Sequence, residues 1–103
     1  MEQKQLTQFP LVDKVIKVPL FRTGQATAVL VRLDKDGVVA EHSHPGHDVF
    51  LHVTAGTVAL TIDGSEHTAG PDQFLHLDGN ERIRLENKEA ERAAVYIVLC
   101  KQK

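Results

Sequence analysis

Four of the six histidines of this chain lie in one short stretch, AEHSHPGHDVFLHVTAG, which runs from Ala40 to Gly56. They are His42, His44, His47 and His52. Imidazole is the commonest transition-metal ligand in proteins, and it also exchanges a proton near neutral pH. Alternate side chains of a strand share a face, so His42 and His44 can point into one site. The stretch predicts a polar pocket built on that pair, and the histidines of the stretch either hold a metal ion or are polar residues of a strand and a turn.

The strand that follows the cluster has one apolar face and one mixed face. Its apolar face is formed by Val49, Leu51 and Val53, which we expect to line the pocket wall. Phe50 and His52 fall on the opposite face, so His52 is expected to point away from the core. Asp48 joins that outer face if the strand begins early enough.

The parity of the preceding segment, VVAEHSH, gives a second expectation. Val38 and Ala40 share a face with the two histidines of the pair, while Val39 falls on the other face with Glu41 and Ser43. The apolar part of that face would continue the wall of the pocket.

The elements around the histidines read as short strands along the whole chain. Segments rich in β-branched residues alternate with turn signals such as Asp36-Gly37, Asp63-Gly64 and Asp78-Gly79. We expect strands in 15–18, 26–33, 38–44, 49–55, 57–63 and 93–100, with further short strands in SEHTA, DQFLHL and ERIRLEN. Residues 1–10 read as a loose arm, with a short helix or an added strand as options, and NKEAER at 87–92 could form one helical turn. Many short strands in one domain indicate an antiparallel all-β sandwich or barrel.

The composition limits the classes of function. With 103 residues the chain forms one domain, residues 1–103. Net charge is −2 and no basic run is present, so no nucleic-acid partner is expected. No apolar run approaches the ~20 residues that cross a bilayer, so no membrane partner is expected. The amino terminus lacks an apolar secretory core and the chain has one cysteine, Cys100. Both observations favour the cytoplasm.

The stretch HSHPGHDVFLHVTAG resembles the first motif of the cupins, which are small jelly-roll β-barrels. That motif has a histidine pair, a glutamate and a glycine, and its histidines and glycine match His42, His44 and Gly56. The second cupin motif resembles GPDQFLHLDGNERIRLEN, from Gly70 to Asn87. The resemblance spans roughly residues 26–98 and implies an all-β, antiparallel jelly-roll fold. Its functional meaning is broad, because one fold serves many activities.

The chain departs from the cupin pattern where the remaining metal ligands belong. Val49 stands at the position of the expected glutamate, with Asp48 one residue away. In the second motif, the histidine position falls on Glu81 or Arg82, depending on the count. Glu81 shares a face with the apolar positions 83 and 85, so it is the better inward candidate. His76, at the usual proline position, is a further candidate pocket residue.

Two imidazoles and one carboxylate form a set that suits divalent Fe, Mn, Ni or Zn. The resemblance therefore implies His42, His44 and Glu81 as metal ligands, with His47 or Asp48 as an additional ligand. The alternative is a metal-free pocket in which the ancestral ligands have been lost. Three functions stay open: a metalloenzyme of the oxygenase, isomerase or lyase type, a non-catalytic module that binds a small molecule, and a metal-binding domain without turnover.

A small sandwich exposes sheet edges and faces that need cover. Phe50 on an outward face and the segment VDKVIKV could supply a contact with a second copy. Single-domain cupins are commonly dimers, so the resemblance also implies a homodimer. A small-molecule ligand and a second copy are thus the expected partners.

Overall fold

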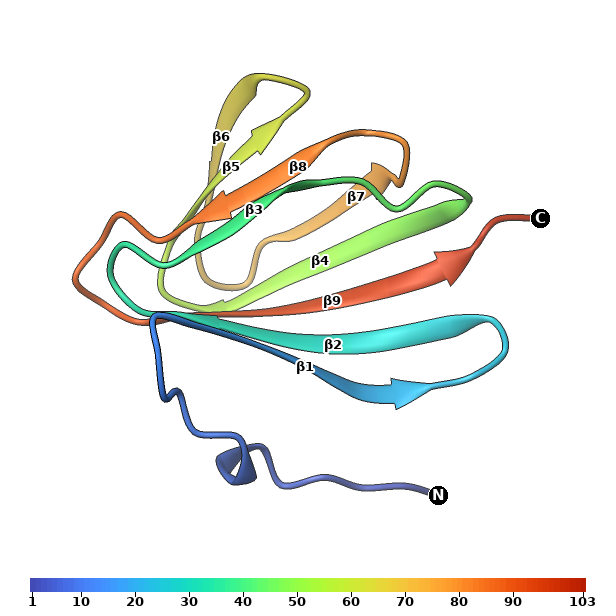
Figure 1. Ribbon diagram of the computed structural model, residues 1–103, viewed down its shortest axis with the longest axis horizontal. Helices are drawn as coiled ribbons and strands as arrows, with labels where there is room; N and C mark the ends of the chain where they lie inside the picture. The colour runs from blue at the N-terminus through green and yellow to red at the C-terminus, as the bar shows by residue number, and fades with distance from the viewer.

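The computed structural model describes residues 1–103 as two antiparallel sheets with a short amino-terminal arm (Figure 1). The strands are β1 (Val15–Arg22), β2 (Ala26–Leu33), β3 (Val38–His42), β4 (His47–Ala55), β5 (Val58–Ile62), β6 (Ser65–Ala69), β7 (Phe74–Asp78), β8 (Ile83–Glu86) and β9 (Ala93–Lys101). The arm contains one 3₁₀ turn, Leu6–Gln8, and the predicted helical turn at 87–92 does not form. No helix of the chain is long and apolar enough to cross a membrane.

One sheet has five strands in the order β1-β2-β9-β4-β7, and the other has four in the order β3-β8-β5-β6. Strands distant in sequence are neighbours, as where β9 lies between β2 and β4. This crossed order is that of a jelly roll, and it confirms the predicted all-β, antiparallel fold class. The strand β1 forms one edge of the first sheet and β3 one edge of the second, and these two edges do not pair.

The core lies between the two sheets, where the inward faces of their strands meet. Val49, Leu51 and Val53 of β4 are at most 3% exposed, and they pack against Leu60 and Leu85 of the other sheet. Removing such side chains from water is the main favourable contribution to folding, at about 25 cal/mol per Å² of apolar surface. The alternation in the sequence therefore identified the buried face of β4 correctly.

Turn residues punctuate the strands as the sequence predicted. Asp63 and Gly64 connect β5 to β6 with φ values of 48° and 83°. Two successive positive φ values match a two-residue hairpin turn, which Asp and Gly adopt at low cost. This connection fixes the register of β5 against β6 from Val58–Ala69 to Ile62–Ser65.

The two ends of the sandwich differ (Figure 1). At one end lie the β1–β2 hairpin, the β3–β4 turn and the carboxyl terminus. At the other end the fully buried Asn87 ties the connections together: its Nδ2 donates to the carbonyls of Leu33 and Glu91, at 3.0 and 2.8 Å. Its Oδ1 accepts from the amide of Glu89 at 2.9 Å. This second end is called the Asn87 end below.

The amino-terminal arm is held by Arg32 of β2. The guanidinium of Arg32 donates to the carbonyl oxygens of Phe9 and Leu6. Arg32 pairs with Ile16 of β1 and with Ala94 of β9. It lies on the outer face of the five-stranded sheet, because its neighbours Val31 and Leu33 face the core and side chains alternate along a strand. The arm is therefore attached to the sheet face that points away from the core.

Candidate functional site

A pocket of ≈ 340 Å³ opens between the two sheets, beside the unpaired edges of β1 and β3. We call it the inter-sheet pocket. Its lining comes from four strands and the turn after β3, and consists of Lys17, Pro19, Val29, Val31, Val39, His42, His44, Ile97 and Leu99. The structure therefore brings His42 and His44 together in one cavity, as their spacing predicted.

His42 reaches the pocket through an irregularity in β3. Val39 is 4% exposed and faces the core, whereas Val38 and Ala40 are exposed, so the predicted face of 38–40 is reversed. The pairing with β8 shifts between Val39 and His42. That shift turns His42 inward only three residues after Val39, where strict alternation would have placed it on the other face.

His44 lies beyond the end of β3, in the turn that leads to β4. The amide of His44 donates to the Gly79 carbonyl at 2.7 Å, and the Gly79 amide donates to the His47 carbonyl at 2.8 Å. A Cβ on residue 79 would overlap the carbonyl oxygens of His44 and His47, so only glycine permits this contact. The β7–β8 connection thus holds the turn that carries His44.

The two pocket imidazoles contact one another edge to face, with ring centroids 4.7 Å apart and planes at 85°. His42 Nδ1 lies 2.8 Å from the carbonyl oxygen of Ala40. A carbonyl only accepts, so this hydrogen bond needs the proton on Nδ1 and leaves Nε2 free as an acceptor. Burial lowers the pKa of His44 below 6.5, and electrostatic repulsion between the protonated ring and His42, His47 and Lys17 lowers it further.

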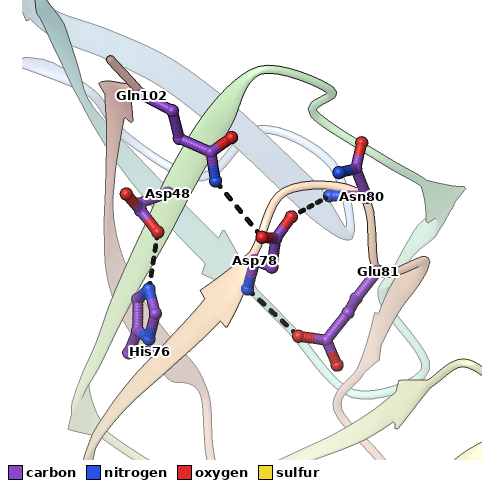
Figure 2. A network of polar contacts seen from close by, with 6 residues as sticks. All are labelled: Asp48, His76, Asp78, Asn80, Glu81 and Gln102. Carbon is purple, nitrogen blue, oxygen red and sulfur yellow. Dashed lines mark hydrogen bonds and ion pairs between the residues drawn. The ribbon is translucent and has the colours of Figure 1, made fainter.

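Glu81 does not reach the pocket. Its Oε1 accepts from the Asp78 amide at 3.0 Å (Figure 2). The Glu81 amide donates to the Asp78 carbonyl, also at 3.0 Å. The carboxylate therefore closes a tight turn before β8. Ile83 and Leu85 do face the core as predicted, but the strand begins after Glu81, so their alternation does not extend to it.

Asp48 and His76 lie on the outer face of the five-stranded sheet. His76 Nε2 donates to Asp48 Oδ1 at 2.8 Å (Figure 2), and the His76 ring packs against Phe50 at 5.0 Å between centroids. The strand β4 begins at His47, so alternation turns Asp48 outward with Phe50. His76 is therefore not a pocket residue, because β7 pairs with β4 so that it stands opposite Phe50.

A neighbouring carboxylate, Asp78, completes the polar contacts drawn in Figure 2. The Asn80 amide donates to Asp78 Oδ1 at 2.9 Å, and Gln102 Nε2 donates to Oδ2 at 3.3 Å. These hydrogen bonds stabilise the ionised form, so they lower the pKa of Asp78. The cluster orders the loop at the pocket end without entering the pocket.

His47 is the remaining candidate for a third imidazole in the pocket. It shares the inward face of β4 with Val49, but its Nδ1 contacts the Pro45 carbonyl at 3.1 Å and its side chain is not part of the lining. No group of three or more His, Cys, Asp or Glu side chains is close enough to hold a metal ion. Two imidazoles fall short of the three or four protein ligands of an ordinary transition-metal site. The residues present do not complete such a site.

Sequence reasoning missed most of the pocket wall. Val49, Leu51 and Val53, predicted to line it, lie in the core but not in the lining. The apolar surface of the pocket is formed by Pro19, Val29, Val31, Val39, Ile97 and Leu99. The sequence could not show this because it does not reveal which strands border the open edge. The sequence does contain an indication of Lys17 as a pocket residue, since this lysine interrupts the apolar alternation between Val15 and Pro19.

His52 lies on the outer face of β4 as predicted, stacked on Phe74 of β7 at 5.2 Å between centroids. Phe74 is 66% exposed. Together with Phe50 they form an aromatic surface outside the five-stranded sheet. The homodimer expected on this face stays a prediction.

Comparison with known proteins identifies the family. Residues 29–100 match the sequence pattern of the cupin domain.

The chain belongs to the cupin family.

This cupin is similar in fold to several solved structures. The TT1209 protein of Thermus thermophilus shares 21% identity over 100% of both chains, with a TM-score of 0.86. A double-stranded β-helix protein of Klebsiella pneumoniae has 13% identity, coverage of 98% of this chain and 90% of that one, and a TM-score of 0.87. A predicted oxalate decarboxylase of Thermotoga maritima has 16% identity, coverage of 85% and 81%, and a TM-score of 0.80. No curated protein matches this cupin in sequence. At these identities the solved structures support the fold alone.

Proposed function

We propose that this cupin is a module that binds a small organic molecule in the inter-sheet pocket. The observation that carries the proposal is the lining: apolar side chains from β1, β2, β3 and β9 converge with the two imidazoles of His42 and His44. Small-molecule sites commonly combine apolar walls with a few polar groups that fix orientation. The free Nε2 of His42 and the ring of His44 supply those groups.

The carboxylates suggested as metal ligands are engaged elsewhere, which favours the metal-free alternative. Glu81 accepts a hydrogen bond within its own turn, and Asp48 accepts one from His76 on the outer face. Bringing either into the pocket would break a hydrogen bond and rebuild the local backbone. The metalloenzyme is for this reason not the function we propose.

A divalent transition metal held by His42 and His44, with the remaining positions filled by water or ligand, is the second candidate. The contact of His42 Nδ1 with the Ala40 carbonyl favours it, because the same contact presents Nε2 as a lone-pair donor. Fe, Mn, Ni and Zn remain the ions to test. A bound ion would supply Lewis-acid chemistry.

The deciding experiment combines elemental analysis with a binding screen on untagged protein. The protein is incubated with each of the four ions, desalted and analysed, and a library of small neutral and charged molecules is screened by protein-observed NMR. The variants are His42→Ala and His44→Ala, with His52→Ala on the outer face as the matched control.

We expect less than a tenth of an ion per chain, and molecules that shift pocket signals of the wild type and His52→Ala but bind the pocket variants more weakly. About one ion per chain, lost in both pocket variants and kept in the control, would establish the second candidate instead. A library that shifts no pocket signal would contradict the proposed module.

A further inference from the structure

The inter-sheet pocket contains nitrogen bases but no carboxylate. Its polar lining is Lys17, His42 and His44, and the rest of the lining is apolar. A charged group facing an apolar cavity is stabilised when an opposite charge enters with it. The chain does not provide that opposite charge within the pocket, so a ligand is the natural source.

Lys17 is positioned for this role by the register of β1. Its Cα pairs with Val31, which is 1% exposed, so Lys17 projects from the inward face of the edge strand. The five ion pairs of the structure involve other side chains. The Lys17 ammonium therefore stands at the rim of the pocket without a carboxylate partner, in line with its contribution to the electrostatics of His44.

The size and charge of the pocket restrict the class of ligand that it can bind. A volume of ≈ 340 Å³ is near the small end of the ~300–1,000 Å³ found for small-molecule sites. Lysine provides one permanent positive charge, whereas imidazoles are mostly neutral at pH 7. One fixed charge beside apolar walls from Val29, Val31 and Ile97 matches a single carboxylate on an apolar body better than a dianion.

We infer that the inter-sheet pocket binds a small monocarboxylate, with its carboxylate on Lys17 and His44 and its apolar part against β2 and β9. This inference rests on the proposed function and names its ligand class. Charge-assisted hydrogen bonds to an ammonium are roughly twice as strong as neutral ones, so Lys17 determines the preference for an anion over a neutral molecule.

The test is an NMR titration of metal-free protein with hexanoate and benzoate, with their neutral amides, and with inorganic phosphate. Backbone amide signals locate the binding site and give the affinity. The variants are Lys17→Gln, which keeps most of the side-chain volume, and Lys14→Gln, an exposed lysine outside the pocket as the matched control.

We expect at least one carboxylate to shift signals around Lys17 and Val31 and to bind about tenfold more tightly than its amide. Lys17→Gln should abolish that preference, while Lys14→Gln keeps it. Amides that bind in the pocket as tightly as carboxylates would overturn the inference and leave the proposed function standing. Phosphate binding tighter than both carboxylates would overturn the monocarboxylate. If none of these probes shifts a pocket signal, the inference is overturned, and the library screen described above decides the proposed function separately.

Discussion

His44 is a pocket residue whose acid–base chemistry is altered by the fold. Its pKa is lowered by burial and by electrostatic repulsion with His42, His47 and Lys17, so it is mainly an unprotonated imidazole at pH 7. A neutral imidazole both donates and accepts a hydrogen bond, whereas an imidazolium only donates. The surroundings of His44 therefore allow it either to donate a hydrogen bond to a ligand or to accept one from it.

The pKa of His44 gives the first prediction. Titration of the imidazole signals by NMR should place its midpoint below 6.5 in the folded protein and near 6.5 in urea. The unfolded chain then binds a proton at His44 before the folded one does. The free energy of unfolding should accordingly decrease as the pH falls from 6.5 through the lowered pKa. A midpoint at or above 6.5 in the folded protein would contradict the electrostatic account.

Gly79 gives the second prediction. A Cβ there would overlap the carbonyls that hold the His44 turn, so Gly79→Ala should lower the free energy of unfolding by about 1–3 kcal/mol. It should also displace His44 and weaken binding in the pocket. Gly24→Ala is the matched control, because a Cβ at Gly24 meets no atom within 4 Å. Urea unfolding of both variants measures the difference, and equal stabilities would show that the turn adapts.

At the scale of elements, the strands were predictable and the exceptions to their regularity were not. The range 26–33 matches β2, and Asp63-Gly64 forms the hairpin it indicates, because alternation and turn chemistry are local properties. The shift between Val39 and His42 depends on pairing with β8, which is distant in sequence. The orientation of Glu81 could not be predicted either, because it depends on where β8 begins.

Asn87 provides the prediction at the scale of elements. Asn87→Ala removes the donors to the carbonyls of Leu33 and Glu91 and one acceptor, at about 1 kcal/mol for each hydrogen bond, so the free energy of unfolding should fall by about 3 kcal/mol. Asn80→Ala is the control, since Asn80 is exposed and contributes through its backbone amide. Thermal or urea unfolding makes the comparison. A loss in Asn87→Ala no larger than in the control would mean that water replaces these hydrogen bonds.

At the scale of the whole molecule, the outer face of the five-stranded sheet is only partly covered. Phe74 is 66% exposed and stacks on His52 beside the half-buried Phe50. The amino-terminal arm is attached to the same face through Arg32. An exposed aromatic surface of this kind is commonly an interaction site.

The expected homodimer gives the last prediction. Sedimentation equilibrium should show a dimer that Phe74→Ser weakens at least tenfold, because the substitution removes an exposed aromatic side chain from the contact. Val38→Ser, which removes an exposed apolar side chain from the other sheet, should leave the dimer intact. A monomeric wild type, or equal weakening by both variants, would contradict a dimer through this face.

The Asn87 end has a consequence for how the molecule responds to change. Its buried side-chain bonds fasten the β2–β3 and β8–β9 connections to one another, and nothing in that network touches the inter-sheet pocket. Amide hydrogens near Asn87 should thus exchange with solvent more slowly than those around His44. The hydrogen bonds that fasten the connections and the side chains that bind a ligand thus lie at opposite ends of the molecule. A pocket side chain can therefore be substituted without loss of the fold. Such an arrangement lets new ligand preferences arise by substitution at the pocket end alone.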